Sequence, residues 1–212
     1  DDDKVFEFGK SVVKYIYSRA MERETGKYIT SATSPDMKFG TKVEPYNLKI
    51  VEDQIGKVTE VGFKHHPEIY SLGASSDGFC KSKNAVVENK ACTSWETHFV
   101  RNYEVIDEKS TDFWQTQLEM MVYEVDNCIY IISEPPKNIF EYLNDEKGFE
   151  EFKDECKVNV RYLKASPIHQ KAMLTRVKIV ESTCTEFLKD KNKDLKEILY
   201  EQIEKFKEER VS

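Results

Sequence analysis

The sequence predicts a mixed α/β fold, in which helices flank a central mixed sheet and the C-terminal part is helical. The hydrophobic periodicity carries this prediction. Apolar residues recur at three-and-four spacing over residues 5–24 and 37–54, whereas from Lys57 onward they alternate at a period of two. Helical spacing then returns and dominates the charged segment 138–212.

The first half of the chain is expected to hold two helices and then short strands. Residues 5–24 predict the first helix, which Gly26 ends. The second helix is expected within residues 37–54. Because proline breaks a helix interior, Pro45 fits only if a helical turn begins near Glu44. Strand candidates are residues 58–63, 69–72, 77–80 and, most clearly, 85–91.

The second half is expected to be mainly helical, with one apolar strand. The elements in order are a helix at about 95–103 capped by Thr93 and Ser94, a helix at 112–125, a strand at 128–133, and helices from Asn138, where residues 185–210 carry one apolar stripe. We expect a single domain over 5–212, with its core at about 37–136 and a helical C-terminal part at about 138–212. Residues 1–4 resemble an expression-tag remnant and are left out of the fold reasoning.

Composition narrows the classes of function. The net charge of −7 repels nucleic acid, so binding to it would need a local basic track or a metal in an acidic site. The five cysteines include no CxxC pair, which argues against a zinc knuckle, a disulfide framework or an iron–sulfur cluster. Together with the absence of an apolar run of membrane-spanning length, they favour a reducing, intracellular location.

The segment SLGASSDGFCKSKNAVVENKACTS holds the chemistry. Residues two apart on a strand share a face, so Glu88 and Lys90 are expected to project together. A turn at residues 81–84 would bring Asp77 alongside Glu88 in a hairpin. Hard divalent cations such as Mg²⁺ prefer carboxylate and carbonyl oxygens, so the Asn89 backbone carbonyl is a further candidate ligand. The plainer alternative is a solvated surface salt bridge.

Four motifs in order resemble the lambda-phage-type alkaline exonucleases, also called the YqaJ-like viral recombinase group, within the PD-(D/E)xK nucleases. They are GTKVE ending at Glu44, SSDG containing Asp77, ENKA containing Glu88 and Lys90, and QTQ from Gln115 to Gln117. The resemblance extends from about Lys14 to Pro136. It implies a restriction-endonuclease-like core in a single nuclease domain.

The resemblance also implies a role for each motif residue. Asp77, Glu88 and the Asn89 carbonyl would hold Mg²⁺, for which Mn²⁺ would substitute, and Glu44 would place a second metal or the attacking water. Lys90 would be the catalytic lysine. The remaining candidates are Gln115 and Gln117, which would support the site, and Thr93 and Ser94, which would lie near DNA phosphates at a helix N-terminus.

The chain departs from the family pattern at three places. Ser76 stands where the motif has proline, and Asn89 stands where the family has an apolar residue. We recognise no counterpart of the amino-terminal segment whose arginine grips a 5′-phosphate, and Lys10, Lys14 or Arg19 are the candidate substitutes. This third departure bears on polarity and processivity more than on hydrolysis.

The resemblance implies a metal-dependent DNA exonuclease that resects double-stranded ends, 5′ to 3′, for viral recombination in a host cytoplasm or nucleus. Its expected partners are double-stranded DNA ends, a single-strand annealing protein and copies of itself in a trimeric ring, with no membrane. Two alternatives stay open: a structure-specific or restriction-like endonuclease, and a catalytically silent DNA- or protein-binding scaffold. The aromatic residues Trp95, Phe99 and Trp114 are expected to be core residues rather than platforms for bases.

Overall fold

A computed structural model describes residues 6–28 and 32–211. The chain divides into two compact units, Thr33–Ser166 and a second made of Asp1–Ala32 with Pro167–Ser212. The segment 138–166 therefore belongs to the larger unit. None of the helices in the described ranges is long and apolar enough to cross a membrane.

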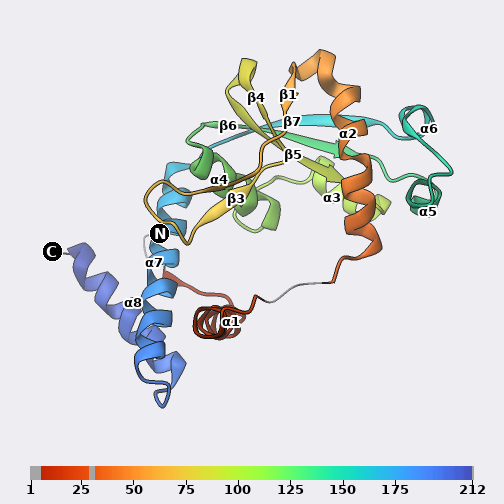
Figure 1. Ribbon diagram of the computed structural model, residues 1–212. Coiled ribbons are helices and arrows are strands. Elements are labelled where there is room, and N and C mark those ends of the chain that lie inside the picture. Colours follow the sequence, from red (N-terminus) through yellow and green to blue (C-terminus); the bar gives the residue numbers. More distant parts are fainter. Residues whose placement is uncertain (1–5, 29–31, 212) are drawn as a thin grey trace. The chain divides into compact units, whose positions relative to one another are not determined.

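A mixed five-stranded sheet forms the centre of the larger unit (Figure 1). Its strands, in spatial order, are β1 (Val58–Thr59), β4 (Gly78–Cys80), β5 (Ala85–Ala91), β6 (Asn127–Ser133) and β7 (Val158–Lys164). Only the β5–β6 pair is parallel within the described sheet. A separate antiparallel pair is formed by β2 (Phe63–His65) and β3 (Gly73–Ser75). The predicted mixed sheet is confirmed.

Helices cover both faces of this sheet. The helices of the larger unit are α2 (Pro35–Ile55), α3 (Trp95–Tyr103), α4 (Thr111–Tyr123), α5 (Ile139–Leu143) and α6 (Phe149–Glu155). Ala85 and Val87 of β5 pack with residues of α2, whereas Val86 packs with Met120 of α4. Strand alternation therefore directs even-numbered residues of β5 toward α4 and odd-numbered ones toward α2. This parity decides which helix each site residue meets.

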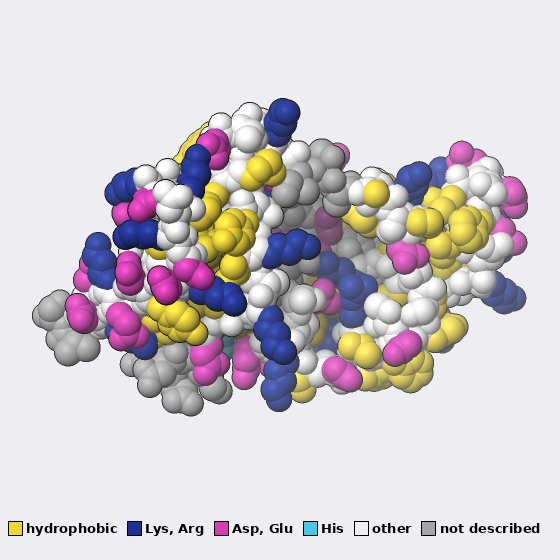
Figure 2. All heavy atoms as spheres, turned by 90° about the horizontal axis from the view of Figure 1, so that it is seen from below, with side chains coloured by type: hydrophobic (Ala, Val, Ile, Leu, Met, Phe, Trp, Pro, Cys, Tyr) yellow, Lys and Arg dark blue, Asp and Glu magenta, His cyan; other side chains and the backbone are white. Residues whose placement is uncertain are grey.

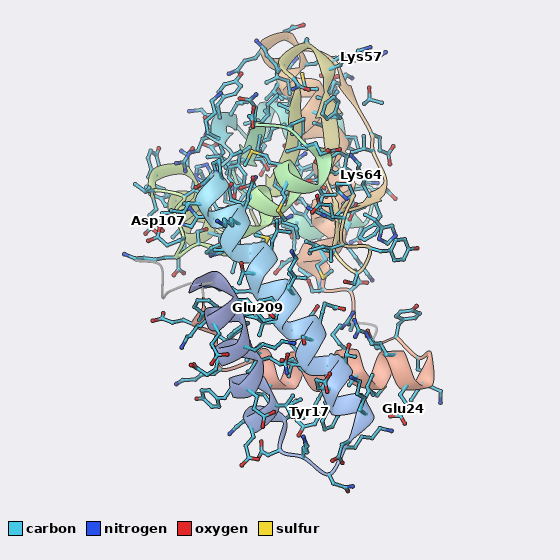
Figure 3. All side chains as sticks on the ribbon, turned by 90° about the vertical axis from the view of Figure 1, so that its left-hand side faces the viewer. Tyr17, Glu24, Lys57, Lys64, Asp107 and Glu209 are labelled. Carbon is cyan, nitrogen blue, oxygen red and sulfur yellow. The ribbon has the colours of Figure 1, made fainter. Side chains whose placement is uncertain are left out.

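The smaller unit consists of α1 (Val12–Thr25), α7 (Pro167–Lys189) and α8 (Leu195–Val211). Its core is a cluster of buried aliphatic and cysteine side chains that includes Ile16, Ile179 and Leu195. Tyr17 of α1 meets Phe187 edge to face at a centroid distance of 5.3 Å. Glu24, also in α1, forms an ion pair with Lys191. Tyr17 and Glu24 are labelled in Figure 3.

The second helix is longer than predicted, because Pro45 lies inside it rather than in its first turn. The helix begins at Pro35, and the Ser34 side chain accepts a hydrogen bond from the Met37 amide as its N-cap. An interior proline costs about 3 kcal/mol. Buried residues at four-residue spacing, Phe39 and Val43 among them, offset that cost because each contributes about 1.5–3 kcal/mol.

Three other expectations about the elements were wrong. The first helix begins at Val12, after Gly9, and the predicted start at Val5 lies outside the described residues. Residues 69–72 form a turn before β3 instead of a strand, and His65 in β2 stacks on Tyr70. The apolar stripe at 185–210 belongs to two helices.

The largest omission was β7, in a segment predicted to be helical. Val158, Val160 and Tyr162 alternate with Asn159 and Arg161, a period-two pattern that the surrounding charged helices obscured. Residues 58–63, predicted as one strand, instead hold β1 and the first residue of β2, which belong to different sheets. The strand β5 has the predicted bounds, and Ser94 caps α3.

Two of the expected core aromatics lie on the surface of α3. Trp95 is 54% exposed and Phe99 is 57% exposed. The expectation that they are core residues was therefore wrong. Trp114 is half-buried, and its indole nitrogen donates to the Glu108 carbonyl at 2.9 Å.

Candidate active site

The hairpin of β4 and β5 places Asp77, which directly precedes β4, beside the middle of β5. Gly78 pairs with Val87, so Asp77 and Glu88 come next to each other in register. The Asp77 carboxylate accepts a hydrogen bond from the Asn89 amide at 2.7 Å. The predicted hairpin and the approach of the two acidic residues are both present.

The residues on either side of Asp77 fix the turn into the hairpin. Ser76, at the position where the motif has proline, is buried, and its single hydroxyl hydrogen lies within reach of two carbonyls, those of Gly78 and Val87. Gly78 packs so closely that a Cβ there would meet a Val58 methyl at 2.4 Å. Serine thus holds the turn through a shared hydrogen bond in place of the rigidity of proline, and glycine is required by the close approach of β1.

Glu88, Lys90 and Gln115 form a closed polar cluster between β5 and α4. The Lys90 ammonium lies 2.5 Å from a Glu88 carboxylate oxygen and donates to the Gln115 side-chain carbonyl at 2.8 Å. The Gln115 amide in turn donates to the same Glu88 oxygen at 2.8 Å. Glu88 is only 2% exposed. This arrangement excludes the alternative of a solvated surface pair.

Glu119 is a buried carboxyl group that the sequence reading missed. It lies one helical turn beyond Gln115, whose amide also donates to it at 3.1 Å. Burial and the neighbouring charge of Glu88 raise the pKa of Glu119 to about 10. The spacing from Gln115 to Glu119, four residues on one helix face, was the available signal.

Asp77 and Glu44 are the other acidic groups of the site. Burial, followed by the charge of Glu88, raises the pKa of Asp77 to about 7. The same two causes raise the pKa of Glu44, which α2 brings near Glu88 and Lys90. The charge of Glu88 therefore disfavours ionisation of three neighbouring carboxyl groups, those of Glu44, Asp77 and Glu119.

A second group missed by the sequence reading adjoins Lys90. Asp112 lies 3.8 Å from the Lys90 ammonium, accepts from the Tyr130 hydroxyl at 2.5 Å, and pairs with Arg101 at 3.0 Å. Although burial opposes it, hydrogen bonding from Tyr130 and the charge of Arg101 lower the pKa of Asp112. Asp112 therefore stays ionised and orients the two cations.

A cleft of about 500 Å³ adjoins the cluster, and of the acidic residues described above only Glu44 lines it. Its lining includes Glu44, Asn89, Lys90, Thr93 and Arg101. Arg101 also lines a neighbouring groove of about 1020 Å³ between α3 and the start of α4.

The two polar residues at the start of α3 have different surroundings. Thr93 lines the cleft. The Ser94 hydroxyl accepts from the Thr97 amide as the helix cap.

Gln117 is directed away from the cluster. Its amide donates to the Lys164 carbonyl at 2.9 Å, and its side-chain carbonyl accepts from the Ser166 amide at 2.7 Å. Of the two glutamines in the QTQ motif, Gln115 therefore contacts Glu88 and Lys90, whereas Gln117 hydrogen-bonds to the backbone at the end of β7.

The donor chemistry of Asp77 and Glu88 suits a hard divalent cation. One Glu88 oxygen is buried without a hydrogen-bond partner, and one Asp77 oxygen accepts from Asn89. Within the described ranges, no three His, Cys, Asp or Glu side chains are grouped as a ready-made metal site. The fit is therefore to a cation held by one or two carboxylates and completed by carbonyl and water oxygens, as is usual for Mg²⁺.

Comparison with solved structures places the fold. LHK-Exo in complex with dAMP matches with a TM-score of 0.60 and 21% identity over 99% of this chain and 91% of that one. The alkaline exonuclease LHK-Exo from Laribacter hongkongensis matches with a TM-score of 0.56 and 20% identity, over 99% and 90% of the two chains. A phage-related exonuclease from Haemophilus somnus matches with 0.56 and 12%, over 99% and 86%. These likenesses show the fold.

Comparison at the level of sequence supplies the family. No curated protein gives a significant match. The profile of the YqaJ-like viral recombinase domain matches residues 7–126, more than half of the 212 residues. This range contains the β4–β5 hairpin, Glu44 of α2, and Gln115 and Gln117 of α4. The chain therefore belongs to the YqaJ-like viral recombinase family.

Proposed function

We propose that this protein is a Mg²⁺-dependent exonuclease that resects double-stranded DNA ends, 5′ to 3′, into single-stranded tails for annealing. The observation that supports it most is the buried contact of Lys90 with Glu88 and Gln115, on a strand whose neighbour carries Asp77. Family membership and the exonucleases of the same fold support the reaction class.

Each residue of the cluster takes a part in phosphodiester hydrolysis. Asp77, Glu88 and the Asn89 carbonyl hold Mg²⁺, for which Mn²⁺ substitutes, while Glu44 positions a second ion or the attacking water. When bound, the metal polarises the phosphate and activates water. Lys90 stabilises the negative charge that develops on the phosphate, because its ammonium is held at the mouth of the cleft by Glu88 and Gln115.

The surface charge limits how DNA is held. The net charge of −7 repels a duplex, and the face in Figure 2 mixes Lys and Arg with Asp and Glu, so neither sign dominates it. DNA contact therefore depends on local cations. Arg101 is our candidate, because it lines the cleft and its guanidinium is oriented by Asp112.

The assembly belongs to the proposal as well. By resemblance, the chain acts as a trimeric ring on DNA ends, together with a single-strand annealing protein, in an infected host cell. Light scattering of the purified protein tests the first point: a mass of three chains supports the ring, and a monomer at working concentration contradicts it.

The first experiment compares linear duplex DNA with covalently closed duplex DNA, in Mg²⁺ and in EDTA. We expect loss of the linear DNA only, in Mg²⁺ only, and its abolition by Lys90→Ala. Lys147→Ala is the matched control, because Lys147 also bridges two carboxylates, those of Glu141 and Glu155, but lies away from the cleft. Cutting of closed circles would instead favour the endonuclease, and cleavage of neither DNA would favour the binding scaffold.

A further inference from the structure

Two buried side-chain amides, those of Asn47 and Asn89, connect α2 to β5. The Asn47 side-chain amide donates to the Asn89 side-chain carbonyl at 2.8 Å and to the Ser133 hydroxyl at 3.3 Å. Asn47 is 0% exposed and Asn89 is 6% exposed. Asn47 belongs to α2, and its partners Asn89 and Ser133 lie on the face of β5 and β6 that packs against α2, opposite the face that carries Glu88.

This pair replaces what would otherwise be apolar packing. The other odd-numbered residues of β5 that face α2 are Ala85 and Val87, in a cluster with Val51 and Ile55 of α2. A buried amide costs free energy unless all its groups are paired, and the Asn47 side-chain carbonyl is buried without a partner. Hydrophobic residues would stabilise this contact more simply, so the amides are retained here at a cost to stability.

Asn89 forms hydrogen bonds with two acidic residues of the proposed metal site, Glu44 and Asp77. The Asn89 side-chain amide donates to the backbone carbonyl of Glu44 at 3.1 Å, and the Asn89 backbone amide donates to Asp77 at 2.7 Å. Asn47 lies three residues after Glu44, on the same side of α2. Pro45, between them, has no amide hydrogen and so removes one internal hydrogen bond of the helix.

The hydrogen bonds of the pair fall at the turn of α2 that contains Pro45, where the helix lacks one of its internal hydrogen bonds. Asn89 donates to the Glu44 carbonyl and accepts from Asn47, so β5 contacts this turn on both sides of Pro45.

We propose that Asn47 and Asn89 are positioning residues, which hold α2 against β5 and so keep Glu44 beside Asp77 for the metal. The inference rests on the proposed function, since it assigns the pair to that same site. The side chains of Asn47 and Asn89 do not touch the metal in this account, although the Asn89 backbone carbonyl is a proposed ligand; both side chains act through Glu44.

Metal binding in two backgrounds tests the inference. Asn47→Leu, Asn89→Leu and the double variant are made in the wild-type chain and in Glu44→Gln, and Mg²⁺ affinity is measured by calorimetry without DNA. We expect Mg²⁺ to bind about tenfold more weakly in the wild-type background. In Glu44→Gln the further loss should be less than about twofold, because both changes act through one carboxylate.

Stability is measured on the same proteins to separate packing from positioning. The double variant replaces both amides with apolar groups, so its melting temperature should lie closer to that of the wild type than those of the single variants. Asn47→Ala removes the amide without adding volume, should the leucines misfold. Asn127→Leu, at the opposite end of β6, is the matched control and should leave Mg²⁺ affinity unchanged.

Two results would overturn the inference, and both differ from failure of the proposed function. One is an equal loss of affinity with and without the Glu44 carboxylate, which would mean that the pair acts elsewhere. The other is full Mg²⁺ affinity in the double variant. If the wild type itself neither binds Mg²⁺ nor cleaves DNA, the proposed function fails, and the inference fails with it.

Discussion

The raised pKa of Asp77 predicts that metal binding displaces a proton near neutral pH. Burial and the charge of Glu88 raise this pKa from 3.8 to about 7. At about pH 6, roughly 0.9 of the Asp77 side chains are protonated, and at about pH 8 roughly 0.1 are. Because a ligand carboxylate must be ionised, Mg²⁺ should release about 0.9 proton from Asp77 at the lower pH and about 0.1 at the higher.

The same shift predicts how the metal-free protein responds to pH. Between the unfolded pKa of 3.8 and the folded value of about 7, folded Asp77 holds a proton that the unfolded chain lacks. Its contribution to stability is therefore largest below pH 4 and is lost as the pH rises through 7. The loss is on the order of 4 kcal/mol.

Calorimetry in buffers of different ionisation enthalpy counts the released protons. Asp77→Asn is the direct comparison, since it should abolish both the pH-dependent release and most of the Mg²⁺ binding. Proton release that is equal at pH 6 and pH 8 would refute the assignment of a raised pKa to this ligand. A stability of the metal-free protein that rises between pH 5 and pH 8 would contradict it independently, provided that Asp77→Asn removes the rise.

Three further predictions concern neighbouring residues. Glu119→Gln should keep or raise the melting temperature at pH 8, because glutamine replaces a carboxyl that is already protonated; a fall of several degrees would show an ionised Glu119. Gln117→Leu should cost about 2–4 kcal/mol in chemical denaturation, because the part-buried Lys164 carbonyl and Ser166 amide lose their hydrogen bonds with Gln117, with Mg²⁺ affinity unchanged. Weaker Mg²⁺ binding without loss of stability would place Gln117 in the metal site. With Ca²⁺ as the divalent cation, Arg101→Ala should lower the slope of log DNA affinity against log salt concentration by about one. An unchanged slope would limit Arg101 to orienting Asp112.

Local patterns were enough to predict the hairpin. The apolar run of β5, the turn residues before it and the cap at Ser94 all lie within a stretch of 24 residues, Ser71 to Ser94. Strand parity then placed Glu88 and Lys90 on one face. What these patterns could not supply is the identity of the opposing residues, because Gln115, Asp112 and Glu119 meet β5 only through the packing of α4 on the sheet.

The wrong expectations about individual elements also have physical causes. Pro45 was expected near a helix start, since its local preference is against an interior position, yet the burial of α2 on the sheet outweighs that preference. The strand β7 was missed because it is an edge strand whose side chains are mostly half-buried, so its alternation is weak. Gln117 was grouped with Gln115 by motif, although two residues apart on a helix do not share a face.

The most direct test of the account separates metal binding, assigned to Asp77, from stabilisation of the charge that develops on the phosphate, assigned to Lys90. Mg²⁺ affinity and the single-turnover rate of hydrolysis of a linear duplex are measured for the wild type, Asp77→Asn and Lys90→Ala. The account predicts that Asp77→Asn loses both Mg²⁺ binding and hydrolysis, while Lys90→Ala still binds Mg²⁺ and loses hydrolysis by a hundredfold or more, roughly the effect of removing one charge-stabilising donor. Hydrolysis at the wild-type rate by either variant would contradict it.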